Sequence, residues 1–228
     1  NILVISALLS LLGTGVFVKI SSSFNLGKEI RAEGPETHLK KRGTPTMGGI
    51  VFILVALWVP LAFLPDIQVW LPLGVLIGAA ALLGFLDDFA ALARKKRAAA
   101  DTTTGTLARY HIVGQLLIGA LFGSMVVHTF GTEIFGNTWI DIPFIALVIT
   151  GSMNAFNFTD GLDGLAAGVS AIILLFFLPS PFAFALLGGL LGFLWYNAHP
   201  ARVIMGGVGS ETLGAAIAGL AIIHNAVW

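Results

Sequence analysis

The sequence contains no cysteine, few charged residues and no net charge. Of its 228 residues 11% are charged, and 12 Lys and Arg balance 12 Asp and Glu. Without cysteine, disulfides, Cys-ligated zinc and thiol catalysis are excluded, and the zero net charge gives no indication of a nucleic-acid partner. Soluble domains have about 25% charged residues, whereas this chain is 57% hydrophobic with a mean hydropathy of +0.93. The composition predicts a membrane protein.

Apolar runs long enough to cross a bilayer as helices, about 17–25 residues, occur at eight places. They predict an all-α integral membrane protein in which residues 1–228 form a single polytopic domain. We interpret the first run as a retained span, because no charged leader or cleavage site precedes it. The runs lie at roughly 1–20, 47–65, 69–86, 110–130, 140–158, 162–179, 181–197 and 211–228.

Basic residues occur in only some of the connections between these runs. They follow the first, third and seventh runs, so that eight alternating helices place all 12 Lys and Arg on one side of the membrane. Positively charged connections stay in the cytoplasm, which predicts that the N-terminus faces outward. Asp87, Asp88, Asp160 and Asp163 then lie at the cytoplasmic face. Because a carboxylate within the bilayer costs about 2.5–3.5 kcal/mol, these four are expected to line a wet cavity.

The stretch LKKRGTPTMGGI (39–50) places basic residues before glycines. Thr44 is predicted to N-cap a helix that has Pro45 at its first position. Gly48 and Gly49 would leave backbone N–H groups approachable, and a helix N-terminus favours an anion. The motif predicts either a phosphate site or only a capped membrane helix with basic anchors.

A second glycine-rich turn, YNAHPARVIMGGVGSETLG (196–214), enters the last run. Ser210 is a plausible N-cap, Glu211 suits a first helical turn, and Arg202 offers a positive charge to a phosphate. A flexible capped hairpin is the alternative. The five histidines of the chain show no metal-ligand spacing, so we interpret each as a lone interfacial residue.

Two adjacent acids, Asp87 and Asp88, end the third run in GFLDDFA (84–90). Adjacent helical residues point about 100° apart. The pair therefore predicts one base or phosphate-facing acid and one partner that tunes or orients it. The alternative is a charged helix end at the water interface.

The stretch NAFNFTDGLDGLAAG (154–168) carries Asn154, Asn157, Asp160 and Asp163 at a repeat of three. Since a helix has about 3.6 residues per turn, this repeat predicts a slanted polar stripe. Amide and carboxylate oxygens suit Mg²⁺ with phosphates, or a nucleoside donor. The alternative is a polar loop between two spans.

Together these motifs resemble those of the phospho-N-acetylmuramoyl-pentapeptide transferases, the MraY family of the polyprenyl-phosphate N-acetylhexosamine-1-phosphate transferases. The likeness covers essentially the whole chain, and the motifs occur in the family's order. They are GPETHLKKRGTPTMGG (34–49), GFLDD (84–88), TDGLDGLA (159–166) and LGFLWYN..PA (191–201).

The resemblance implies transfer of phospho-MurNAc-pentapeptide from its UDP carrier to undecaprenyl phosphate, giving lipid I and UMP for peptidoglycan synthesis. It implies Mg²⁺ as cofactor, the bacterial cytoplasmic membrane as location, and a homodimer, because the family tends to dimerise. Asp87 or Asp88 would assist the lipid phosphate as nucleophile. The implied catalytic residues are Asp87, Asp88 and Asp160; the implied substrate-binding residues are Lys41, Thr46, Asn157, Asp160 and Asp163; the implied metal ligands are Asn157 and Asp160.

This chain departs from the family's pattern at several positions. The family's glycine-rich turn reads like FMGD.GS with a metal-binding Asp, whereas IMGGVGS here puts Gly207 at that position and Ile204 at an aromatic one. Two family lysines align with Ala91 and His111. The family continues with two more spans and a histidine-rich loop, which this chain is expected to lack. Glu211, one helical turn beyond Gly207, is a candidate substitute for the absent carboxylate.

Two other functional classes stay open on the sequence alone. Gly207 favours a relative that binds nucleotide-sugar or lipid phosphate without turnover, and a related polyprenyl-phosphate sugar-1-phosphate transferase has similar motifs. A transporter or channel is the third alternative, since acidic loops and broken helices also mark ion pathways. Against it, the acids cluster at one membrane face rather than at the midplane.

Overall fold

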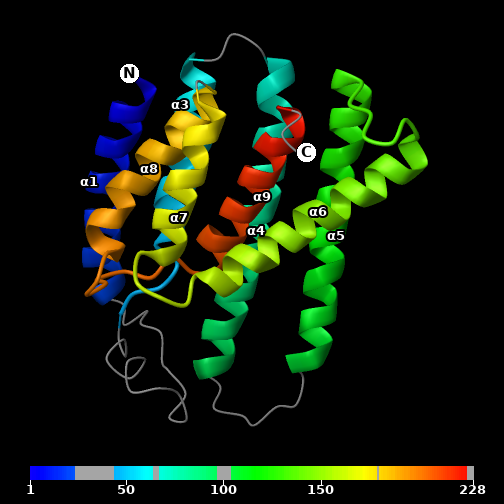
Figure 1. The fold of residues 1–228 in the computed structure, drawn as a ribbon. Coiled ribbons are helices and arrows are strands. Elements are labelled where there is room, and N and C mark those ends of the chain that lie inside the picture. Colours follow the sequence, from blue (N-terminus) through cyan, green and yellow to red (C-terminus); the bar gives the residue numbers. More distant parts are fainter. Residues whose placement is uncertain (24–43, 64–66, 97–103, 179, 225–228) are drawn as a thin grey trace.

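The computed structural model describes residues 1–23, 44–63, 67–96, 104–178 and 180–224, and within them the regular structure is helical (Figure 1). Each of the eight predicted runs corresponds to one helix, the sixth being extended by a short 3₁₀ turn, η1. The elements are α1 (Ile2–Ser23), α3 (Gly49–Phe63), α4 (Ile67–Lys96), α5 (Thr104–Phe130), α6 (Thr138–Thr159), α7 (Leu165–Leu174), η1 (Leu175–Phe177), α8 (Pro181–Asn197) and α9 (Gly207–Ile223).

Four of these helices are long and apolar enough to cross a membrane, namely α1, α4, α5 and α6. The other four apolar helices have 10–17 residues. The all-helical membrane class is thus supported, while the number of spans and their orientation stay predictions.

Helix α9 lies at the centre of the bundle, with α1, α3, α7 and α8 on one side and α5 and α6 on the other (Figure 1). Its residues Val208–Leu220 are buried along their whole length. A central helix needs small residues where backbones approach closely. Gly209 of α9 packs against Gly49 of α3, and a Cβ atom on Gly49 would lie 2.8 Å from the Gly209 nitrogen.

The first turn of α9 differs from the prediction. The helix begins at Gly207 rather than at 211, and Gly206 is its N-cap with φ of +77°, a left-handed conformation that only glycine adopts without strain. Ser210 is therefore not the N-cap. Its hydroxyl lies inside the helix and donates to the Gly206 carbonyl at 3.1 Å.

The predicted helix start at Thr44 and Pro45 is also wrong, because α3 begins at Gly49. Residues 44–48 instead run beside the turn that leads into α9. The Pro45 carbonyl accepts from the Ile204 N–H at 2.8 Å, and the Gly48 N–H donates to the Ile204 carbonyl at 3.0 Å. These bonds join the start of α3 to the start of α9.

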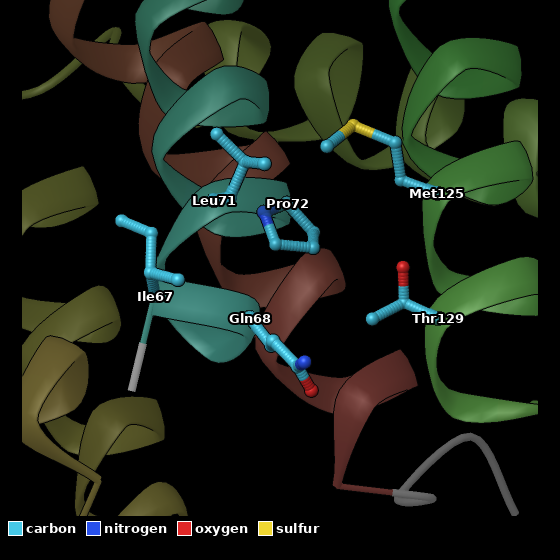
Figure 2. A pocket seen from close by; sticks show the side chains of 6 residues that line it. All are labelled: Ile67, Gln68, Leu71, Pro72, Met125 and Thr129. Carbon is cyan, nitrogen blue, oxygen red and sulfur yellow. The ribbon is translucent and has the colours of Figure 1, made fainter. Parts of the chain in front are cut away.

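The helices alternate in direction, so that α4, α6 and α8 end on the same side of the molecule on which α3, α7 and α9 begin (lower side of Figure 1). The described helix ends and turns that carry predicted site residues therefore meet on one side; they contain Thr46, Asp87, Asp88, Asn157, Asp160 and Asp163. A cavity of about 400 Å³ lies elsewhere, between the start of α4 and the end of α5, and Figure 2 shows its lining residues. They are Ile67, Gln68, Leu71, Pro72, Met125 and Thr129.

Candidate active site

The paired acids at the end of α4 have different surroundings. Asp87 is exposed, whereas Asp88 is partly buried against the start of α9. The Val208 N–H donates to Asp88 Oδ2 at 3.0 Å. A carboxylate at a helix N-terminus is stabilised by the unpaired N–H groups and by the helix dipole. Asp88 therefore ties α4 to α9, and Asp87 is the member of the pair that faces outward.

Gly207 lies between two carboxylates. A Cβ atom built on it would be 3.4 Å from Asp88 Oδ1 and 3.5 Å from Glu211 Oε1, with no closer neighbour. The space for a side chain exists, and two acids border it. Glu211 thus brings a carboxylate next to the position at which the family pattern has an aspartate.

Glu211 is the centre of a buried polar network in α5, α6 and α9. Its side chain is 1% exposed and contacts the side-chain nitrogens of three residues. His111 Nε2 lies 2.8 Å from Glu211 Oε2, Gln115 Nε2 donates to the same oxygen at 3.1 Å, and Asn157 Nδ2 donates to Glu211 Oε1 at 3.3 Å. A buried carboxyl group needs such partners, because a buried polar group without hydrogen bonds is unfavourable.

The predicted polar stripe of residues 154–163 divides into two parts. Asn154 and Asn157 lie on the last turns of α6 and face the network, where Asn154 Nδ2 donates to Gln115 Oε1 at 2.6 Å. Asp160 follows as the C-cap of α6, so the helical repeat ends there. Asp163 lies in the turn before α7, beyond the helix.

Asp163 joins the α6–α7 turn to the α8–α9 connection. Its Oδ2 accepts from the Ala201 N–H at 3.1 Å and lies 3.0 Å from His199 Nδ1. Its side chain is only 10% exposed. The turn is fixed further by Asn197, whose Oδ1 accepts from the Gly164 N–H at 3.1 Å. In this structure Asp163 holds two loops together.

The start of α3 differs from the phosphate site that the sequence predicted there. The Gly48 and Gly49 N–H groups donate to the carbonyls of Ile204 and Met205, at 3.0 and 2.9 Å, so they are not open to an anion as expected. Thr46, a predicted substrate-binding residue, is buried, with 7% of its surface exposed. Lys41 lies outside the described residues.

Two histidines differ from the interpretation as lone residues, since His111 pairs with Glu211 and His199 with Asp163. Sequence reasoning missed Gln115 and the role of His111. The available signal was the pair His111 and Gln115 at i and i+4 in an otherwise apolar run, because such polar groups require a partner on a facing helix.

The candidate site contains oxygen-bearing side chains that could be some, but not all, of the ligands of a hard cation. In the described portion of the chain, no group of three or more His, Asp or Glu is close enough to hold a metal ion. Mg²⁺, however, is commonly held by one or two carboxylates plus substrate phosphates and water. Asn157 is exposed on the last turns of α6, and Asp160 caps the same helix. Their oxygens are hard donors that suit a Mg²⁺ sharing its coordination with phosphates, and they do not form a closed protein cage among the described residues.

Two protein-family models match this chain. The model for glycosyl transferase family 4 matches residues 70–225, and the phospho-N-acetylmuramoyl-pentapeptide-transferase signature 1 matches residues 41–53. The chain belongs to glycosyl transferase family 4, a class that agrees with its apolar helices and clustered acidic motifs.

Curated relatives narrow the assignment. A phospho-N-acetylmuramoyl-pentapeptide-transferase of Deinococcus radiodurans is 42% identical over 99% of this chain and 76% of that protein. Proteins of the same name from Thermoanaerobacter sp. and Oceanobacillus iheyensis are 40% and 38% identical, over 96% and 97% of this chain and 73% and 74% of their own lengths. Within the class, the chain belongs to the phospho-N-acetylmuramoyl-pentapeptide-transferase family.

Proposed function

We propose that this chain transfers phospho-MurNAc-pentapeptide from UDP-MurNAc-pentapeptide to undecaprenyl phosphate, giving lipid I and UMP. The observation that carries the proposal is the family membership over the whole chain, together with acidic motifs that meet on one side of the bundle. The bond that forms joins an oxygen of the lipid phosphate to the phosphorus that carries the sugar. The bond that breaks links this phosphorus to UMP, which leaves.

Asp87 is the proposed acid beside the attacking lipid phosphate, because it is the exposed member of its pair. Asp88 fixes the end of α4 against α9 through the Val208 N–H. Asp163 orders the loop beside Asp160, and Asn157 with Asp160 would hold the nucleotide phosphates and their cation. When bound, Mg²⁺ would neutralise charge on the phosphates, which is the main requirement of phosphoryl transfer.

The proposed location is the bacterial cytoplasmic membrane, crossed several times, with the site at the cytoplasmic face. A lipid acceptor and a soluble donor have to meet at a membrane surface. The predicted orientation from the basic residues places the ends of α4, α6 and α8 at that surface.

The test is Mg²⁺-dependent UMP release by the purified chain, supplied with both substrates in detergent. Asp87→Asn should lower the rate by about 100-fold or more, the usual contribution of a positioned acid or base. Glu133→Gln is the matched control, since Glu133 is an exposed acid at the opposite end of the bundle, between α5 and α6. A wild-type chain without UMP release, or an Asp87→Asn variant at the wild-type rate, would contradict the proposal.

Gly207 favours a second candidate, a family member that binds the substrates without turnover. Its missing side chain removes the carboxylate that the family pattern places beside the phosphates. This candidate predicts binding of UDP-MurNAc-pentapeptide without UMP release, and release restored by Gly207→Asp. Isothermal titration alongside the release assay separates the two candidates.

A further inference from the structure

A carboxylate determines the orientation of every amide in the network around Glu211. The Glu211 side-chain oxygens accept from the amides that contact them, so these amides turn N–H toward Glu211. Gln115 therefore turns Nε2 to Glu211 Oε2 at 3.1 Å and Oε1 to Asn154 Nδ2 at 2.6 Å. His111 Nε2 also lies 2.8 Å from Glu211 Oε2.

Asn157 is oriented in the same way, and it is the member of the network that reaches the surface. Its Nδ2 donates to Glu211 Oε1 at 3.3 Å, which leaves Oδ1 as the acceptor that this exposed residue presents. Ser210 lies 3.4 Å from that oxygen, but its single proton has a shorter acceptor in the Gly206 carbonyl at 3.1 Å. Asn157 Oδ1 is thus available to a cation or to a donor on the substrate.

We propose that Glu211 is a positioning residue for Asn157, which it locks with the amide oxygen facing the substrate site. The inference rests on the proposed function for the identity of that site, where Asn157 would serve a phosphate-bound divalent cation. Removing a residue that hydrogen-bonds to a metal ligand and orients it typically lowers metal affinity or activity by about 10–100-fold. Glu211 is placed for this role by α9, one turn after Gly207.

The test is an exchange of acid and amide between the two positions. In Glu211→Gln, the Gln oxygen can still accept from His111 and Gln115, which turns its NH₂ toward Asn157. Asn157 then has to flip and present NH₂ to the site. Combining Glu211→Gln with Asn157→Asp restores an acceptor that faces the site, since the new carboxylate accepts from the Gln NH₂ with one oxygen and keeps the other.

Mn²⁺ serves as the probe, and its binding to the purified full chain is measured by electron paramagnetic resonance. Glu211→Gln should weaken Mn²⁺ binding by about 10-fold or more, and the double variant should regain most of the loss. Ser152→Ala is the matched control, because Ser152 Oγ donates to the Gly214 carbonyl at 2.7 Å between the same helices outside the network. It should bind Mn²⁺ as the wild type does.

Three results would overturn the inference: wild-type Mn²⁺ affinity in Glu211→Gln, a double variant no better than Glu211→Gln, or a wild-type chain that binds no Mn²⁺. If Glu211→Gln does not fold, Glu211→Asp replaces it, since this variant keeps the charge but withdraws it from Asn157 by one methylene, and it should weaken binding in the same direction. The binding readout needs no turnover. A wild-type chain that binds Mn²⁺ but releases no UMP would therefore count against the proposed function alone.

Discussion

At the scale of single residues, Gly207 leaves a space at the start of α9 that two acidic side chains border. Asp88 Oδ1 and Glu211 Oε1 lie 3.4 and 3.5 Å from the point that a Cβ atom on Gly207 would occupy. Like charges about 4–5 Å apart repel by about 3–4 kcal/mol at an effective dielectric constant of about 20. A third carboxylate at this point is therefore unfavourable unless a cation is present.

Gly207→Asp should make the stability of the chain depend on Mg²⁺. In EDTA we expect a Tm about 5–10 °C below that of the wild type, because the repulsion exceeds the gain of less than about 1 kcal/mol from an acid at a helix N-terminus. Added Mg²⁺ should reverse most of the loss. Thermal unfolding with and without Mg²⁺ checks this.

Gly207→Asn is the matched control for that measurement. It has nearly the same shape but no charge, so its Tm should stay within about 2 °C of the wild type in both conditions. Equal Mg²⁺ responses of the Asp and Asn variants would mean that no cation reaches this position.

At the scale of helices, the crossing of α3 and α9 depends on two glycines. A Cβ atom on Gly49 would meet backbone atoms, at 2.8 Å from the Gly209 nitrogen and 2.9 Å from the Met205 carbonyl. Backbone cannot rotate away as a flexible side chain can. At the same crossing, the Gly49 N–H donates to the Met205 carbonyl. This hydrogen bond helps to join the start of α3 to the turn before α9.

Gly49→Ala should therefore separate the two helices and destabilise the chain by about 1–3 kcal/mol, the usual cost of overpacking. This corresponds to a Tm lower by about 3–10 °C. Gly78→Ala in α4 is the matched control, since nothing lies within 4 Å of its Cβ position. It should leave Tm unchanged or raise it slightly, because Ala is the better helix former. Equal Tm values for both variants would contradict the tight crossing.

The sequence predicted helices well and their junctions poorly. Hydrophobic length located each α-helix of the described residues, because an apolar run can be recognised without knowledge of its neighbours. The starts of α3 and α9 were wrong because Gly48 and Gly49 donate to Ile204 and Met205, which are distant in the sequence. Local capping preferences carry no information on such pairing.

The same limit applies to the candidate site. Sequence motifs located the acid pair Asp87 and Asp88 and the acidic turn after α6, because each is a local cluster of polar residues in an apolar chain. The network of His111, Gln115 and Glu211 was not, since its members come from α5 and α9 and meet only after the bundle has packed. Whether the predicted residues act on substrates stays a prediction.

At the scale of the whole molecule, the direction of the bundle in the membrane follows from the alternation of its helices. The α5–α6 connection lies at the opposite end from the α8–α9 connection (Figure 1). The positive-inside rule predicts that the α8–α9 side is cytoplasmic, where the proposed donor, a soluble nucleotide, is found. The absence of cysteine makes this orientation directly measurable.

Single cysteines at exposed positions of the two connections should therefore react differently in intact cells. Glu133→Cys, between α5 and α6, should be labelled by a membrane-impermeant maleimide without permeabilisation, and Ala198→Cys, after α8, only after it. The cysteine-free wild type is the blank, and labelling in detergent shows that both thiols can react. The reverse pattern would place Asp87 outside, away from any nucleotide donor, and the transferase function would fail with it.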